Sequence, residues 1–113
     1  MPYVHLNVSR KLNEEEIAAI REGFAEIMPA LPGKTRDNSM IHIEHACALT
    51  MGDPSQPCAF LEVRLYKASP EENKKDFVKK ASAVISGLAG VAEEKIYINM
   101  IELNEWGVGS RFF

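Results

Sequence analysis

Cysteine is scarce in this sequence of 113 residues, which contains only Cys47 and Cys58. Two cysteines are too few for a disulfide framework, and neither has a partner at the spacing of a metal site. A Cys-x-x-Cys redox motif is also absent, because Leu61 stands three residues after Cys58. Both cysteines lie among apolar residues, which predicts buried free thiols.

Long hydrophobic runs are missing, and so is any concentration of basic charge. No run is long enough to span a membrane, and the N-terminus lacks the charged region and hydrophobic core of a signal peptide. We therefore expect a cytoplasmic protein, or one secreted without a signal peptide, and no membrane partner. The net charge is -3, from 13 basic and 16 acidic residues, and gives no reason to expect a nucleic-acid partner.

Histidine is sparse as well, with His5, His42 and His45 scattered along the chain. His42 and His45 are three residues apart on an expected strand, and they should therefore point to opposite faces of a sheet. Without a second ligand at metal-site spacing, the sequence predicts no metal site.

Hydrophobic residues make up 46% of the sequence and charged residues 26%, which allows a buried core. The length fits one domain spanning residues 1–113. Residues that favour β-structure alternate with others in four stretches. These stretches predict strands at residues 3–8, 40–45, 59–66 and 95–103.

Two helices are expected between these strands. Asn13 is a favourable N-cap with Glu16 as its capping-box partner. Ser69 as a cap and Pro70 at the first helical position favour a second helix, and Gly90 should end it. Apolar residues recur at spacings of three and four in both segments: Ile17, Ile20, Phe24, Ile27 and Leu31, then Phe77, Ala81, Val84, Ile85 and Leu88.

The elements follow one another as strand, helix, strand, strand, helix, strand. This order predicts an α/β protein of the α+β type, in which two β-α-β repeats, at about 1–52 and 57–113, form a four-stranded mixed sheet. Each connection is long enough to return its second strand parallel to the first. Both helices should cover one face, and apolar residues on the other face predict burial against further copies of the chain.

Five short segments, in this order and spacing, resemble a known family. They are MPYV at 1–4, Gly33-Lys34, Pro57-Cys58-Ala59, Tyr97-Ile98-Asn99 and Val108-Gly109. The chain resembles the tautomerase superfamily over essentially its whole length, and most closely its macrophage migration inhibitory factor group. The resemblance implies a homotrimer with active sites between subunits. It also implies cofactor-independent keto–enol tautomerisation of α-keto acids such as phenylpyruvate.

The resemblance also implies roles for particular residues. Pro2, exposed as the terminal amine once Met1 is removed, would be the acid/base, and Lys34 would bind the substrate carboxylate. Tyr66 matches a position that acts through its backbone N–H. Tyr97 and Asn99 match positions that reach the neighbouring subunit's pocket, and Val108 would supply apolar surroundings. An aromatic residue expected just after Gly109 is replaced by Ser110, and Trp106 precedes Val108 instead.

Each of these residues has a simpler explanation when taken alone. A strand tolerates proline at its start, and Lys34 could be a surface lysine on a turn. Tyr97 and Asn99 could serve interface packing and a strand hydrogen bond. Two other functions stay open: a cytokine-like signalling trimer that binds a receptor and keeps a vestigial pocket, or a superfamily dehalogenase or decarboxylase in which Arg64 binds carboxylate.

Overall fold

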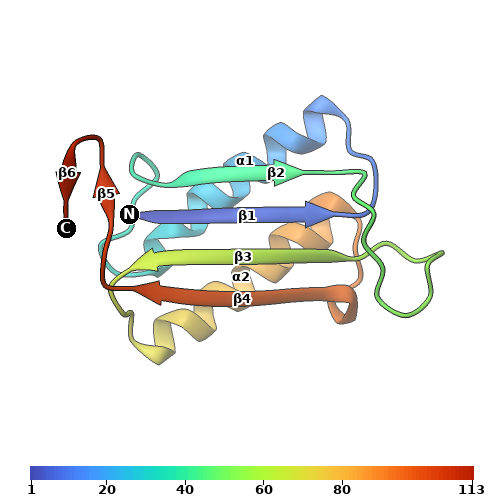
Figure 1. The fold of residues 1–113 in the computed structure, drawn as a ribbon. Coiled ribbons are helices and arrows are strands. Elements are labelled where there is room, and N and C mark those ends of the chain that lie inside the picture. The colour runs from blue at the N-terminus through green and yellow to red at the C-terminus, as the bar shows by residue number, and fades with distance from the viewer.

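The computed structural model describes residues 1–113 as a four-stranded sheet with its helices on one side (Figure 1). Its strands lie in the order β2-β1-β3-β4. The outer pairs, β1 with β2 and β3 with β4, are parallel, whereas the central strands β1 and β3 are antiparallel. The expected mixed sheet is therefore confirmed. The strands are β1 (Pro2–Val8), β2 (Met40–Glu44), β3 (Ala59–Tyr66) and β4 (Ile96–Leu103).

Both long helices lie behind the sheet in Figure 1, on the same face, as expected. Helix α1 (Glu14–Ile27) continues into the 3-10 helix η1 (Met28–Ala30), and helix α2 (Glu71–Ala89) is followed by η2 (Glu93–Lys95). The capping box of α1 is present, because Glu16 N–H donates to Asn13 Oδ1 at 2.8 Å and Asn13 N–H donates to Glu16 Oε1 at 3.0 Å. Gly90 ends α2 with φ of 68°, a left-handed conformation that favours glycine.

The start of α2 differs from the expectation that Ser69 caps it. Pro70 occupies the cap position and no side chain caps the helix. Ser69 is instead held from the end of β4, because its backbone N–H donates to Glu102 Oε2 at 2.6 Å. Glu102 also accepts a hydrogen bond from Lys74 Nζ at 3.0 Å. The prediction of a Ser69 cap is therefore wrong, and a carboxylate distant in sequence anchors this helix end.

The substitution Glu102→Gln should lower thermal stability at neutral pH and have less effect in acid. The Ser69 N–H first, and Lys74 second, hold the pKa of Glu102 below its usual value. A lowered pKa adds stability above the unfolded-state value, about 4.3, and that stability is lost as pH falls through the folded value. We expect a melting temperature about 3 °C lower at pH 7, with the difference from wild type closing below pH 4. Glu94→Gln, at an exposed carboxylate of η2, is the control.

Alternate residues of the strands pack beneath the helices. On β1 these are Val4, Leu6 and Val8, each at most 1% exposed. The helices contribute Ile20, Phe24, Phe77 and Ile85, all fully buried and all within the expected apolar stripes. The two helices approach closely at Gly23, where an added Cβ would lie 2.9 Å from Val84 Cγ1.

The opposite side of the sheet, which no helix covers, is called here the open face. Polar and apolar side chains are mixed on this face, whereas the sequence led us to expect an apolar surface. Side chains paired across the four strands form rows, and the middle row is entirely polar: His42, His5, Glu62 and Asn99. The members of the open face are Tyr3, His5 and Asn7 on β1, Met40, His42 and Glu44 on β2, Phe60, Glu62 and Arg64 on β3, and Tyr97, Asn99 and Ile101 on β4.

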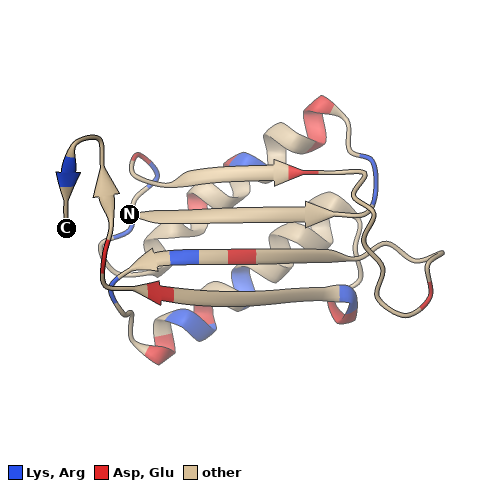
Figure 2. Cartoon of the chain, in the orientation of Figure 1, with Lys and Arg blue, Asp and Glu red and all other residues tan.

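Charged residues are spread over strands, helices and loops without a concentrated basic face (Figure 2). No helix is both long and apolar enough to cross a membrane. Both cysteines are free, as predicted, although Cys47 is half-buried and only Cys58 is fully buried.

A small hairpin extends beyond the sheet at the end where the chain begins (Figure 1). It consists of β5 (Gly107–Val108) and β6 (Arg111–Phe112). Trp106 and Phe113 close it with two backbone hydrogen bonds, Phe113 N–H to Trp106 O at 2.8 Å and Trp106 N–H to Phe113 O at 3.2 Å. This hairpin brings the C-terminal residues to the N-terminal end of β1.

Candidate active site

The start of β1 opens into a hollow of about 430 Å³. Three parts of the chain line it: the first residues, the turn before β2, and the hairpin. The hollow therefore combines segments from both ends of the sequence. Its lining includes Met1, Pro2, Asn38, Met40, Trp106 and Val108.

Lys34 and the main chain of Tyr66 lie beside the first residues of the chain, of which Met1 and Pro2 line this hollow. Pro2 is buried and lies opposite Leu65 in the antiparallel pair of β1 and β3. The next residue of β3, Tyr66, donates its backbone N–H to the carbonyl oxygen of Met1 at 3.3 Å. Lys34 Nζ donates to the carbonyl oxygen of Tyr66 at 3.0 Å. The fold thus places an ammonium group and a backbone N–H beside the start of the chain.

A turn after η1 gives Lys34 its position. Gly33 has φ of 76°, a left-handed conformation that glycine adopts without strain. The turn is closed by the backbone N–H of Lys34, which donates to Leu31 O at 3.1 Å. Leu31 itself is fully buried in the core. The lysine is therefore anchored to the core at its backbone and reaches across to the end of β3 with its side chain.

Burial and charge at this point favour an uncharged amine. The pKa of the Met1 α-amino group is lowered from its ordinary value, first by burial and second by the positive charge of Lys34. Both causes act on any amine at this end of β1, because desolvation and a nearby cation each disfavour the protonated form. The site can therefore present a neutral nitrogen, which is what a general base requires.

Aromatic residues flank the same end of the sheet. The Tyr66 and Phe113 rings lie 6.1 Å apart in a tilted arrangement, and the Arg111 guanidinium lies 5.0 Å from the Phe113 ring centre. Val108 and Trp106 line the hollow itself. Trp106 therefore supplies an aromatic side chain to the hollow, although Ser110 replaces the aromatic residue expected after Gly109.

Tyr97 and Asn99 lie on the open face and are not near Pro2 of the same chain. Tyr97 is opposite Phe60 on β3, five residues from the Leu65 that faces Pro2. This separation corresponds to about 17 Å along the strand. The Tyr97 side chain is 64% exposed. The chain alone therefore brings together Pro2, Lys34, Tyr66 and Val108, but not Tyr97 and Asn99.

Arg64 is paired with a carboxylate on its own strand. Its Nε and Nη2 lie 2.9 and 2.7 Å from Glu62 Oε1. This pairing satisfies two of its donors and offsets its charge, so the geometry gives no support to Arg64 as a receptor for a substrate carboxylate.

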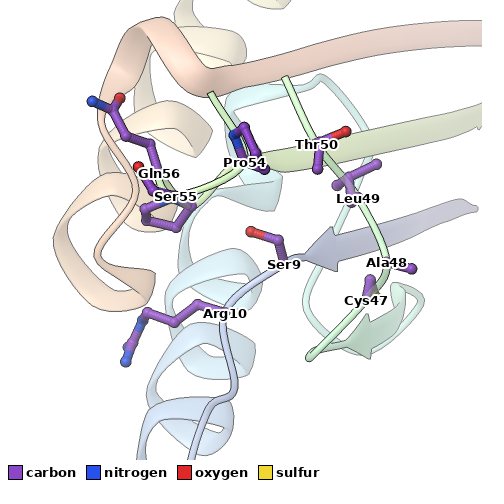
Figure 3. Close-up of a pocket in the computed structure, with 10 residues that line it drawn as sticks. Ser9, Arg10, Cys47, Ala48, Leu49, Thr50, Pro54, Ser55 and Gln56 are labelled. Carbon is purple, nitrogen blue, oxygen red and sulfur yellow. The ribbon is translucent and has the colours of Figure 1, made fainter. Parts of the chain in front are cut away.

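The largest hollow, about 550 Å³, lies at the opposite end of β1 (Figure 3). Ser9 and Arg10 line one side and the loop residues 47–50 and 54–57 line the other. Arg10 is already engaged, since its Nε donates to Ala89 O at 2.9 Å and its Nη2 contacts Glu16. Cys47 also lines this hollow, and its Sγ donates to Asn7 Oδ1 at 3.6 Å. The arginine and the thiol are thus both engaged, so the size of this hollow does not make it the better candidate.

Sequence reasoning missed one feature of the site and one outside it. Asp37 and Asn38, in the turn before β2, line the hollow without belonging to any recognisable motif. On the open face, the fold brings His5 and His42 together with Glu44, although the histidines are scattered along the sequence. The remaining histidine, His45, accepts a hydrogen bond from the Leu12 N–H at 3.0 Å.

Comparison with known proteins gives one family and a consistent set of structures. The family model described as macrophage migration inhibitory factor (MIF) matches residues 1–111. The Leishmania major MIF2 structure is similar with a TM-score of 0.91 and 20% identity, covering 100% of this chain and 97% of that chain. The structure of a MIF-like protein from Entamoeba histolytica has a TM-score of 0.85 at 18% identity, and the match covers 99% of this chain and 98% of that chain. A search of curated protein sequences gives no match.

A further similar structure is that of Pt0534 inactivated by 2-oxo-3-pentynoate. Its TM-score is 0.79 at 14% identity, and the match covers 89% of this chain and 85% of that chain. These likenesses confirm the fold expected from the sequence.

Proposed function

The chain belongs to the macrophage migration inhibitory factor family, and from this premise we propose that it is a keto–enol tautomerase whose base is the Pro2 amine. Removal of Met1 generates that amine. The proposed substrates are α-keto acids of the phenylpyruvate type, and the reaction needs no cofactor. The observation that carries the proposal is the convergence of Lys34 Nζ and the Tyr66 main chain at the buried start of β1.

The reaction is a proton transfer between carbon and oxygen. The neutral Pro2 nitrogen takes a proton from the carbon beside the keto group, and the electron pair of the broken C–H bond moves onto the carbonyl oxygen. The resulting enolate takes the proton back on oxygen to give the enol. A site of this kind needs a neutral base and a donor aimed at the oxygen where charge develops.

The loss of Met1 would supply the donor as well as the base. The Tyr66 N–H now donates to the Met1 carbonyl oxygen, so removing Met1 frees this N–H beside Pro2. Lys34 uses one of its three ammonium hydrogens on Tyr66 O, and the other two stay available for the substrate carboxylate. Pt0534 is inactivated by a 2-oxo acid, which supports the proposed class of substrate.

The site is proposed to be completed by a neighbouring chain in a homotrimer. Within one chain Tyr97 lies about 17 Å along the sheet from Pro2, and both Tyr97 and Asn99 are on the open face, whereas Pro2 faces the helices. Large hydrophobic side chains are exposed on this face and on the hairpin, notably Met40 at 67%, Tyr97 at 64% and Phe112 at 76%. Exposed apolar surface of this kind is typical of a protein–protein interface. Three equivalent sites would then lie between subunits.

The substitution Lys34→Gln should weaken substrate binding and move the pH profile. Loss of the charged contact to the carboxylate should raise KM by about tenfold or more. Lys34 lowers the pKa of the Met1 amine, and its positive charge should act in the same direction on a Pro2 amine. Without it that pKa rises, so the acid limb of kcat/KM should move to higher pH, and the variant should lose most activity on the acid side. The control is Lys79→Gln on α2, which should change neither KM nor the position of the acid limb of kcat/KM.

The function itself is tested with an enol–ketone absorbance assay on protein whose intact mass shows that it begins at Pro2. The proposal expects phenylpyruvate turnover by this form. Negligible turnover of aromatic keto acids by the same form would overturn it and would favour a binding or signalling module that retains the pocket shape.

A further inference from the structure

Three potential metal ligands meet on the open face at a place that the proposed tautomerisation does not use. The parallel pairing of β1 and β2 sets His5 directly opposite His42, and Glu44 follows two residues after His42 on the same side. The nitrogen and oxygen atoms of the three side chains all lie within 4.8 Å of one another. Pro2 lies on the same strand but faces the helices, so the cluster and the proposed base are on opposite faces of the sheet.

Glu44 joins the two imidazoles. Its Oε1 lies 3.0 Å from His5 Nε2 and 3.0 Å from His42 Nε2. Ligand atoms around a tetrahedral zinc ion, each about 2.0–2.1 Å from the metal, are separated by about 3.3 Å. The two nitrogen–oxygen separations are therefore already close to those of a metal site.

The Tyr3 hydroxyl holds the second nitrogen of His42. Tyr3 Oη lies 2.8 Å from His42 Nδ1. A hydroxyl both donates and accepts hydrogen bonds, so it can accept one from the Nδ1–H and leave the lone pair on Nε2 free for a metal. Metal-binding histidines usually make such an outer contact, which fixes the ring and its tautomer. Tyr3 therefore supplies an outer partner for one of the two imidazoles.

We propose that His5, His42 and Glu44 bind a divalent transition-metal ion of the zinc class. Two imidazoles and one carboxylate suit zinc, copper, nickel or iron, whereas magnesium and calcium prefer oxygen ligands. The side chains of the three residues are 22%, 45% and 48% exposed in the single chain, so an ion can reach them there from solvent. Three protein ligands leave a coordination position open. This proposal departs from the sequence-based expectation of no metal and does not rest on the proposed tautomerase activity.

Metal binding would require a small rearrangement of the rings. The His5 and His42 rings are stacked with centres 4.0 Å apart and an angle of 2° between their planes. Lone pairs lie in the ring planes, so parallel rings cannot both point at one ion. The χ2 torsion of histidine has a broad energy minimum, which allows the rings to tilt toward a shared ion. Loss of the stacked geometry is thus part of the expected response.

The experiment measures zinc binding to tag-free protein by equilibrium dialysis, with visible absorbance of bound Co²⁺ as a second readout. We expect one Zn²⁺ per chain and a melting temperature that rises with Zn²⁺ and returns after chelation. His42→Ala and Glu44→Gln should each weaken binding by more than about tenfold. Tyr3→Phe, which keeps all three ligands, should weaken it by about 10- to 100-fold.

Glu94→Gln is the control, because it removes an exposed carboxylate of η2 and leaves the open face unchanged. Its zinc affinity should equal that of the wild type. Unfolding curves recorded without metal show whether each variant is folded, and Tyr3→Phe provides a test that retains both imidazoles. Absence of zinc binding by the wild type, or equal affinity in the wild type and the His42→Ala variant, would overturn the proposal.

Discussion

Replacing Pro2 with glycine is expected to lower kcat/KM for phenylpyruvate tautomerisation by about 10²–10⁴-fold, the usual contribution of a general base. Glycine allows removal of Met1 but leaves a primary amine on a more flexible chain, so neither the basicity nor the position of the nitrogen is kept. The enol–ketone absorbance assay measures the loss, and intact mass shows where each chain begins.

The control is Pro54→Gly, in the loop at the far end of the sheet, which removes a proline without touching the start of β1. It should retain wild-type turnover. If Pro2→Gly kept full activity with a mass that confirmed the substitution, another group would have to be the base.

Mixing two inactive variants is expected to restore activity if each site combines residues from two chains. One parent carries Pro2→Gly and keeps Tyr97, and the other carries Tyr97→Ala and keeps Pro2. Because Tyr97 lies about 17 Å along the sheet from its own Pro2, the two residues can share a site only across an interface. Chains unfolded and refolded together at equal amounts should regain about one quarter of the wild-type sites.

The control uses the same two variants, refolded separately and then mixed under conditions in which the trimers do not exchange subunits. This mixture should stay inactive. Light scattering on each parent shows whether it assembles. Full activity of the Tyr97→Ala parent, or no recovery in a mixture shown to contain mixed trimers, would exclude a site shared in this way.

Much of the fold could be predicted because its signals are local. Alternation along each strand and the Asn13–Glu16 capping box are properties of neighbouring residues, and the structure confirms them. The Ser69 cap failed because Pro70 occupies the cap position, while the backbone N–H of Ser69 itself donates to a distant carboxylate, Glu102. A cap predicted from sequence takes no account of which residues the sheet brings alongside.

The open face shows the same limit. Judged strand by strand, its apolar residues suggested a hydrophobic surface, but cross-strand register sets His42, His5, Glu62 and Asn99 side by side. Register depends on how four separate segments pair, which the pattern of one segment does not contain. The His5–His42 pair was missed for this reason, because its members are far apart in sequence and adjacent only in the sheet.

The candidate site divides in a similar way. Pro2, Lys34, Tyr66 and Val108 came from family motifs, and the fold brings them together at one end of the sheet. Trp106 precedes Val108 in the sequence instead of following Gly109, and the hairpin carries it into the lining of the hollow. No local pattern indicated this, because the path of the hairpin depends on backbone pairing between Trp106 and Phe113.

The most direct test of a catalytic Pro2 amine compares activity with the state of the N-terminus. Preparations of the same wild-type chain that differ in the fraction lacking Met1, as measured by intact mass, are assayed for phenylpyruvate tautomerisation. With Met1 attached the Pro2 nitrogen is an amide and cannot accept the proton, so activity should rise in proportion to the fraction that begins at Pro2 and extrapolate to zero without it. Undiminished turnover by protein that retains Met1 would contradict the proposed mechanism.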